Sequence, residues 1–349
     1  MKEETVNTKA LPTWGVSEIW NAALTDREER KLEVRDYLWA SEIGNPPIDT
    51  YLKMNATPYS NPANDRAKRK FEAGNVFEWI VSLVLKRADV LRDSQKRCEH
   101  QYEGLLRVSG KGDFIAGGQV DPKGAQEFLH FLEEAEMPEV FIRCFGRIVT
   151  YLAEKYPDGI REMPLEVKSI SSFGMDKLEK QRAPIKRHRQ QLFHYLISDG
   201  YQKGLIIYLC RDDLRMMEFA VELSSFVEQE YKSAIAIISA FVQSGTTPPK
   251  EKLIIFDEEY GKFMKNLGVE WSPYLTMLYG FEEPRAYSEI YGKKATNWNR
   301  VMKRVMDNAK MTPLNLDVLK EIEKEGYVIE DIKKQFRMEA AETEEVASA

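Results

Sequence analysis

The apolar positions along the chain change between helical and extended spacing, which is the pattern of a mixed α/β protein. Helical spacing runs over residues 65–91, opening with an aspartate suited to an N-cap, and returns over 186–199 and 224–245. Extended patterns lie between these helices, as a strand over 163–170 and a two-strand hairpin over 203–223. Strands with helices before and after them predict a mixed β-sheet core flanked by helices.

The sections around this core complete the predicted organisation. Residues 103–120 predict a strand, a glycine turn and a second strand, and two helices are expected over 124–137 and 139–156. Five parts result: an N-terminal helical and loop region over 1–64, a core over 65–245, a helical insertion within it over about 122–160, a mainly helical C-terminal region over 246–336 and a disordered acidic tail over 337–349.

The composition is that of a packed globular protein. Hydrophobic residues make up 43% of the 349, which is ample for a core. No stretch of about 18 apolar residues is present, and the first residues lack the pattern of a signal peptide, so we expect a cytoplasmic protein without a membrane segment. Three cysteines, Cys98, Cys144 and Cys210, lie too far apart in sequence to suggest a disulfide framework or a metal knuckle.

Charge is informative only locally, because the net charge of −6 excludes a protein coated in positive charge. The stretch "DKLEKQRAPIKRHRQQ" holds six cations and two carboxylates, and "GKKATNWNRVMKRVMDNAK" holds six cations and one carboxylate. Either run could simply be a solvated helix face. If the second run binds nucleic acid, Trp298 within it is available to stack on bases.

An acid and a base share one face of the predicted strand "MPLEVKSI". Side chains two apart in a strand point the same way, so Glu166 and Lys168 project together while Leu165 and Val167 project to the opposite face. Taken singly, Glu-x-Lys spacing is common and is typical of a solvent-exposed face.

Other candidate groups stand before and after this strand. Asp113 follows two glycines in "SGKGDFIAGG", which would allow close backbone approach to a metal or phosphate, although the same residues suit a tight hairpin turn. Asp121 is a weaker competitor. Gln191 and Tyr195 lie four apart on one predicted helical face, and Glu78 is an acid within an apolar helix segment.

Taken in order, these groups resemble the PD-(D/E)xK nuclease superfamily, particularly its RecB-like branch with phage and CRISPR-associated exonucleases. The G-x-x-D motif corresponds to 110–113, E-x-K to 166–168 and Q-x-x-x-Y to 191–195, and the resemblance covers roughly residues 65–222. It implies a restriction-endonuclease-like sheet and a metal-dependent DNA nuclease, more specifically an exonuclease of recombination, repair or phage DNA metabolism. Departures are Phe77 in place of a histidine and too few cysteines for an iron–sulfur cluster, so none is expected.

The resemblance also implies roles for particular residues. Asp113, Glu166, the Val167 carbonyl and Glu78 would hold the cation, and such oxygen ligands favour Mg²⁺ or Mn²⁺. Lys168 would orient or deprotonate the attacking water, with Gln191 and Tyr195 as positioning groups. DNA would pass over the first basic run, where the expected contacts are Lys177, Lys180, Arg182, Lys186, Arg187, His188 and Arg189.

Two other classes of function remain open from the sequence. A DNA-binding or assembly protein could keep the nuclease fold without turnover, and a structural α/β protein would make the ordered motifs a coincidence. A recombination or replication protein would be a partner for either a nuclease or a DNA-binding protein.

Overall fold

The computed structural model describes residues 32–87, 90–118, 122–136, 154–257 and 261–334, with residues 139, 142, 143, 147 and 151 between them. The chain divides into two units, one formed by 1–44 with 63–240 and the other by 45–62 with 241–349. Segment 45–62 therefore belongs with the C-terminal part of the chain.

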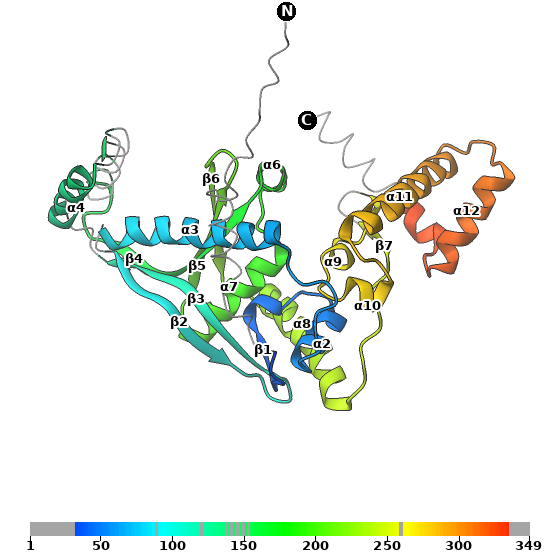
Figure 1. Cartoon of the computed structure of the whole chain (residues 1–349), viewed down its shortest axis with the longest axis horizontal. Helices are drawn as coiled ribbons and strands as arrows, with labels where there is room; N and C mark the ends of the chain where they lie inside the picture. The colour runs from blue at the N-terminus through cyan, green and yellow to red at the C-terminus, as the bar shows by residue number, and fades with distance from the viewer. Residues whose placement is uncertain are drawn as a thin grey trace, which may run out of the picture. The chain divides into compact units, whose positions relative to one another are not determined.

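The first unit contains a six-stranded sheet and the helices that flank it (Figure 1). Its strands are β1 (Tyr37–Trp39), β2 (Leu91–His100), β3 (Arg107–Gly118), β4 (Ile160–Ile170), β5 (Lys203–Cys210) and β6 (Met216–Glu222). Its helices are the 3₁₀ turn η1 (Ala40–Glu42), α3 (Asp65–Arg87), α4 (Pro122–Glu134), α6 (Ser172–Gln181), α7 (Lys186–Asp199) and α8 (Ser225–Ser244).

The sheet is mixed. Its order is β1-β3-β4-β5-β6, and β2 pairs with β3 beside this path. β1 is parallel to β3 and β4 is parallel to β5, whereas the β2–β3, β3–β4 and β5–β6 pairs are antiparallel. Strands β3 and β4, which carry most of the candidate groups, are therefore direct neighbours.

Helices cover both faces of this sheet. On one face, Phe77 and Val81 of α3 pack against Leu165 and Val167 of β4, as strand alternation predicts. α7 contacts β2, β3, β4 and β5, and its buried side chains include most of the residues from 188 to 196. It ends at Gly200, whose backbone at φ +76° suits a glycine C-cap.

The prediction of a strand, a glycine turn and a second strand over 103–120 is wrong. The glycines lie inside β3, which pairs with β2 along most of its length. A Cβ atom on Gly110 would lie 2.9 Å from both the Ala40 Cβ and the Tyr195 Cε1 atoms. Glycine is thus required by close packing between strand and helix rather than by a turn.

The second unit is mainly helical around a small hairpin. It contains α2 (Pro47–Met54), β7 (Ile254–Asp257), β8 (Lys262–Lys265), α9 (Leu267–Glu270), α10 (Leu275–Tyr279), α11 (Pro284–Met306) and α12 (Pro313–Lys324). Its main apolar cluster gathers side chains of the hairpin, α11 and α12. Segment 45–62 joins this unit through a buried hydrogen bond of 2.7 Å from the Ser272 hydroxyl to the Asp49 carboxylate.

The predicted fold class is confirmed: a mixed sheet flanked by helices is followed by a mainly helical C-terminal region. α4 forms the first helix of the predicted insertion, while most of the second helix, the segment before residue 32 and the acidic tail lie outside the described residues. None of the described helices is both long and apolar enough to cross a membrane.

Candidate active site

Glu166 and Lys168 form an ion pair on the face of β4 opposite the α3 cluster. The Lys168 ammonium donates to Glu166 Oε1, and the Glu166 side chain is completely buried. The second carboxylate oxygen of Glu166, Oε2, is buried without a hydrogen-bond partner. An orphaned carboxylate oxygen in the interior is costly, and a bound cation is one of the few groups that would satisfy it.

The electrostatics of this pair follow from burial and from the charges around it. Burial raises the pKa of Glu166, and the charge of Lys168 opposes the rise without cancelling it. For Lys168, burial acts to lower the pKa, but the carboxylates of Glu166 and Asp113 outweigh it, so the pKa is raised. Lys168 is therefore held as an ammonium. Burial disfavours the ionised forms of the carboxyl groups beside it.

Asp113 of β3 joins the same site. Its Oδ2 atom accepts the Val167 backbone N–H at 2.8 Å, which fixes the carboxylate beside the Glu166-x-Lys168 motif. Burial and the nearby charge of Glu166 raise the pKa of Asp113 well above its usual range. Two buried carboxyl groups with raised pKa values, one of them raised by the charge of the other, are a typical arrangement for binding a cation.

Glu78 of α3 is the third carboxylate near this point. Its charge raises the pKa of both Asp113 and Glu166, so the helix brings it within electrostatic reach of both. One of its oxygens is held by the Gln95 side-chain amide of β2 at 2.5 Å. Four candidate groups from three elements, Glu78 of α3, Asp113 of β3 and Glu166 with Lys168 of β4, thus act electrostatically on one site.

Gln191 and Tyr195 lie on one buried face of α7. The Gln191 side-chain amide donates to the Tyr195 hydroxyl at 2.9 Å, so the two side chains share one helical face, as their spacing predicts. Burial, followed by the charge of Glu166, raises the pKa of Tyr195 well above its usual range. The tyrosine is therefore neutral, and it lies close enough to Glu166 to feel its charge.

The donor set fits a hard cation that keeps some of its water. Among the described residues, no group of three or more His, Cys, Asp or Glu side chains forms a ready-made metal cage. Mg²⁺ is typically bound through one or two carboxylates with several retained waters, and the orphaned oxygen of Glu166 beside Asp113 meets that requirement. The Val167 carbonyl remains a predicted ligand.

No protein-family model and no curated protein matches this chain. Among solved structures, the crystal structure of SSO0001 has a TM-score of 0.38 and 13% identity, covering 64% of this chain and 87% of that one. LHK-Exo in complex with dAMP has a TM-score of 0.36 and 11% identity, covering 65% and 93%. The alkaline exonuclease LHK-Exo from Laribacter hongkongensis has a TM-score of 0.31 and 10% identity, covering 65% and 93%. Likeness at this level carries no argument about chemistry, which rests on the residues of the site.

The first basic run lies on α6, the turn after it and the start of α7. Lys180, Arg182, Lys186 and Arg187 are exposed, whereas Lys177 and Arg189 are half-buried. Glu230 of α8 neutralises part of this charge, because it pairs with Lys186 at 3.2 Å and Arg189 at 2.5 Å. Arg187 differs from these two, since its charge acts on Lys168 in the site.

The sequence predicts His188 as a phosphate contact, but its side chain is buried in the interior. The Arg187 Nε–H donates to His188 Nε2 at 3.3 Å, so the proton of the neutral ring lies on Nδ1, which is 3.0 Å from the Tyr208 hydroxyl. Burial and the charges of Lys168 and Arg187 lower the pKa of His188 to about 2. A neutral, buried His188 supports the Arg187 side chain instead of meeting DNA itself.

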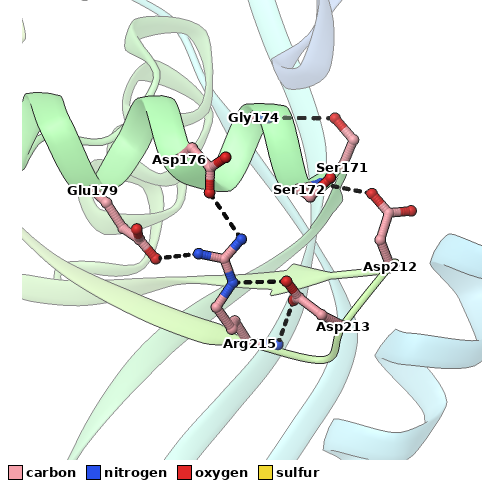
Figure 2. Close-up of polar contacts among 8 residues, drawn as sticks. All are labelled: Ser171, Ser172, Gly174, Asp176, Glu179, Asp212, Asp213 and Arg215. Carbon is pink, nitrogen blue, oxygen red and sulfur yellow. Dashed lines mark hydrogen bonds and ion pairs between the residues drawn. The ribbon is translucent and has the colours of Figure 1, made fainter.

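α6 is tied to the β5–β6 turn by a separate charged cluster (Figure 2). The Arg215 guanidinium contacts three carboxylates at 2.8 Å each: Asp176, Glu179 and Asp213. The Ser172 backbone N–H donates to Asp212 at 2.7 Å, which adds a cap to the first turn of the helix. The two acids within the basic run, Asp176 and Glu179, are thus engaged by Arg215.

The interpretation of Trp298 as a base-stacking residue is wrong. Its side chain is 1% exposed within the apolar cluster of the second unit, and its indole N–H donates to Glu321 at 3.1 Å. The ring also contacts Phe263 with 5.0 Å between centroids. Trp298 is a core residue whose ring is not exposed for stacking on bases, and the Lys294 ammonium of α11 lies 5.3 Å from its ring centroid.

Sequence reasoning missed Gln95 and Ala40. Gln95 contacts Glu78, and Ala40 packs where a Cβ on Gly110 would lie. Neither residue carries a signal in the sequence, because a glutamine among polar residues and an alanine after a short apolar run are both ordinary.

Proposed function

We propose that this chain is a divalent-metal-dependent deoxyribonuclease that hydrolyses phosphodiester bonds. The observation that carries the proposal is the buried pairing of Glu166 with Lys168, with Asp113 on the neighbouring strand and one Glu166 oxygen left without a partner. Structural proteins rarely keep such a group, because a buried, unsatisfied carboxylate destabilises the fold. Its retention is understandable if the site binds a cation.

Asp113 and Glu166 would hold Mg²⁺ or Mn²⁺, with the Val167 carbonyl and Glu78 completing the protein ligands. Such a cation supplies charge stabilisation at the phosphate and lowers the pKa of a bound water. Lys168, kept protonated by the two carboxylates, would donate to the attacking water or to a phosphate oxygen as negative charge develops. Its raised pKa makes this electrostatic role more suitable than that of a general base.

Gln191 and Tyr195 would hold the site in position from helix α7. Their mutual hydrogen bond leaves a neutral phenol near Glu166, where it limits the movement of β3 against α7 without adding charge. We therefore propose that they are positioning residues for the strands that carry the carboxylates.

We further propose that the enzyme acts from DNA ends, as an exonuclease of recombination, repair or phage DNA metabolism. The cations that border the site, above all Arg187, would contact phosphates. Phosphate contacts carry no sequence information, so they suit an enzyme that moves along any sequence.

The test is degradation of linear and circular DNA, single- and double-stranded, with Mg²⁺ or Mn²⁺. Wild type should degrade linear DNA, while Glu166→Gln and Lys168→Ala should lose most activity. Matched controls are Glu218→Gln and Lys203→Ala, both exposed residues of the same sheet, and they should retain it. Normal cutting by the two site variants would refute the site assignment.

The same assay separates the alternatives. Degradation of closed circles at the rate of linear DNA would show that the enzyme is an endonuclease and not an exonuclease. If wild type cuts none of the substrates with either metal but shifts DNA on a gel, the non-catalytic DNA-binding function takes the place of the nuclease.

A further inference from the structure

Strand β2 contains one residue with a left-handed backbone. Gln95 has φ +54°, in the left-handed region, in the middle of a ten-residue strand. This conformation is uncommon for residues other than glycine, asparagine and aspartate, and it costs free energy unless the surroundings enforce it. Strain of this kind concentrates at functional sites.

The interruption stands opposite Asp113. In the ladder between β2 and β3, Ser94 pairs with Phe114 and Lys96 pairs with Gly112. Gln95 and Asp113 fall between these two pairs and are not themselves partners in the register. The left-handed residue of β2 therefore lies opposite the position at which β3 contributes its carboxylate to the candidate site.

The side chain of Gln95 reaches across to α3. Its Nε2 atom donates to Glu78 Oε1 at 2.5 Å, joining residues that are 17 positions apart. Phe77 and Val81 hold the helix backbone against the sheet, but the Glu78 side chain itself is long and only half-buried. One hydrogen bond fixes its first oxygen, and the second is left able to face a cation.

We propose that Gln95 is a positioning residue that orients the Glu78 carboxylate toward the cation, an inference that rests on the proposed function. The left-handed backbone at Gln95 is what directs the amide at α3. Gln95 does not touch the substrate or the reacting atoms. Its effect is on how tightly the cation is held, because outer residues that orient metal ligands set the affinity of the site.

Two substitutions separate the side-chain contact from the backbone conformation. Gln95→Gly suits the left-handed backbone and removes the amide, while Gln95→Asn tolerates that backbone and keeps an amide on a side chain one methylene shorter. Binding of Mn²⁺ alone, measured by calorimetry without DNA, is the readout, together with the melting temperature. Gln101→Gly, on the exposed turn after β2, is the matched control.

We expect both Gln95 variants to bind Mn²⁺ about tenfold more weakly, with a melting temperature no lower than that of wild type. Glu78→Gln should weaken binding as well, and adding Gln95→Gly to it should cause no further loss. Gln101→Gly should bind as wild type does.

The failures are distinguishable. If Glu78→Gln weakens Mn²⁺ binding and both Gln95 variants leave it unchanged, the positioning role is refuted while the proposed function stands. If both variants lose affinity and melting temperature together, Gln95 has a structural role and the inference is wrong. If wild type neither binds Mn²⁺ nor cuts DNA, the proposed function fails and this inference fails with it.

Discussion

His194 should make the first unit less stable as the pH falls below 7. Its ring is fully buried on α7, where Nδ1 lies 2.7 Å from the Tyr231 hydroxyl, and burial lowers its pKa from 6.5 to about 4. Between those values the unfolded chain binds a proton that the folded chain does not. Stability is thus complete above the unfolded pKa and is lost as the pH falls toward the folded one.

The two pKa values set the size of the effect. Linkage gives a loss of about 2 kcal/mol in the free energy of unfolding between pH 7 and pH 5, and about 3 kcal/mol by pH 4. His194→Gln keeps a group able to bond Tyr231 and removes the titration, so the difference between its stability and that of wild type should change by these amounts.

Urea unfolding followed by circular dichroism at pH 5, 6, 7 and 8 measures that difference. Taking the difference cancels the raised carboxyl pKa values of Asp113 and Glu166, which act in the opposite direction because their protonated forms are favoured in the fold. His130→Gln is the control, since its side chain is largely exposed. A difference between wild type and His194→Gln that is constant from pH 7 to pH 5 would refute the reasoning.

Three further predictions test other contacts. Gly110→Ala should lower stability by about 1–3 kcal/mol through overpacking, whereas Gly112→Ala, whose added Cβ would meet its nearest neighbour at 3.6 Å, should cost much less in thermal denaturation. Tyr208→Phe should lower the free energy of unfolding by about 1–3 kcal/mol, because it leaves buried His188 without its hydroxyl partner. Arg187→Ala should weaken DNA binding and reduce the slope of log affinity against log salt by about 1, as measured by fluorescence anisotropy in Ca²⁺.

Much of the sheet and the helix beside it could be predicted because burial on one face leaves a periodic record. The predicted helix over 186–199 has the same bounds as α7, and the predicted strand over 163–170 lies within β4. Both elements bury continuous apolar surface, which fixes their period in the sequence.

β2 could not be predicted, since its residues from 92 to 97 are all exposed and show no alternation. It forms a strand because its backbone hydrogen-bonds to β3, and the local sequence pattern does not reveal a partner strand. The glycines of β3 were misassigned to a turn for a related reason, because the close approach of α7 is a tertiary fact.

The candidate site could be predicted only in part, for the same reason. Glu166 and Lys168 are placed by strand alternation, which the sequence records, whereas Asp113 lies within β3 and not after the turn that its glycines suggest. The neighbours of His188 in the sequence are cations, which suggests an exposed side chain. In the structure the His188 ring is buried against the Tyr208 hydroxyl. Trp298 likewise lies within a basic run while its ring fills the core of the second unit.

The ion pair between the Lys168 ammonium and Glu166 gives the site a folded state that contains no bound cation. Without Lys168, two buried carboxylates would repel each other unless one of them took up a proton or a cation. With Lys168 as an internal counter-ion, the chain can be made and stored folded in a chelating environment. If the chain binds a cation as proposed, the cation would meet the Oε2 atom of Glu166 in a site that is already folded, so its supply could control activity without refolding.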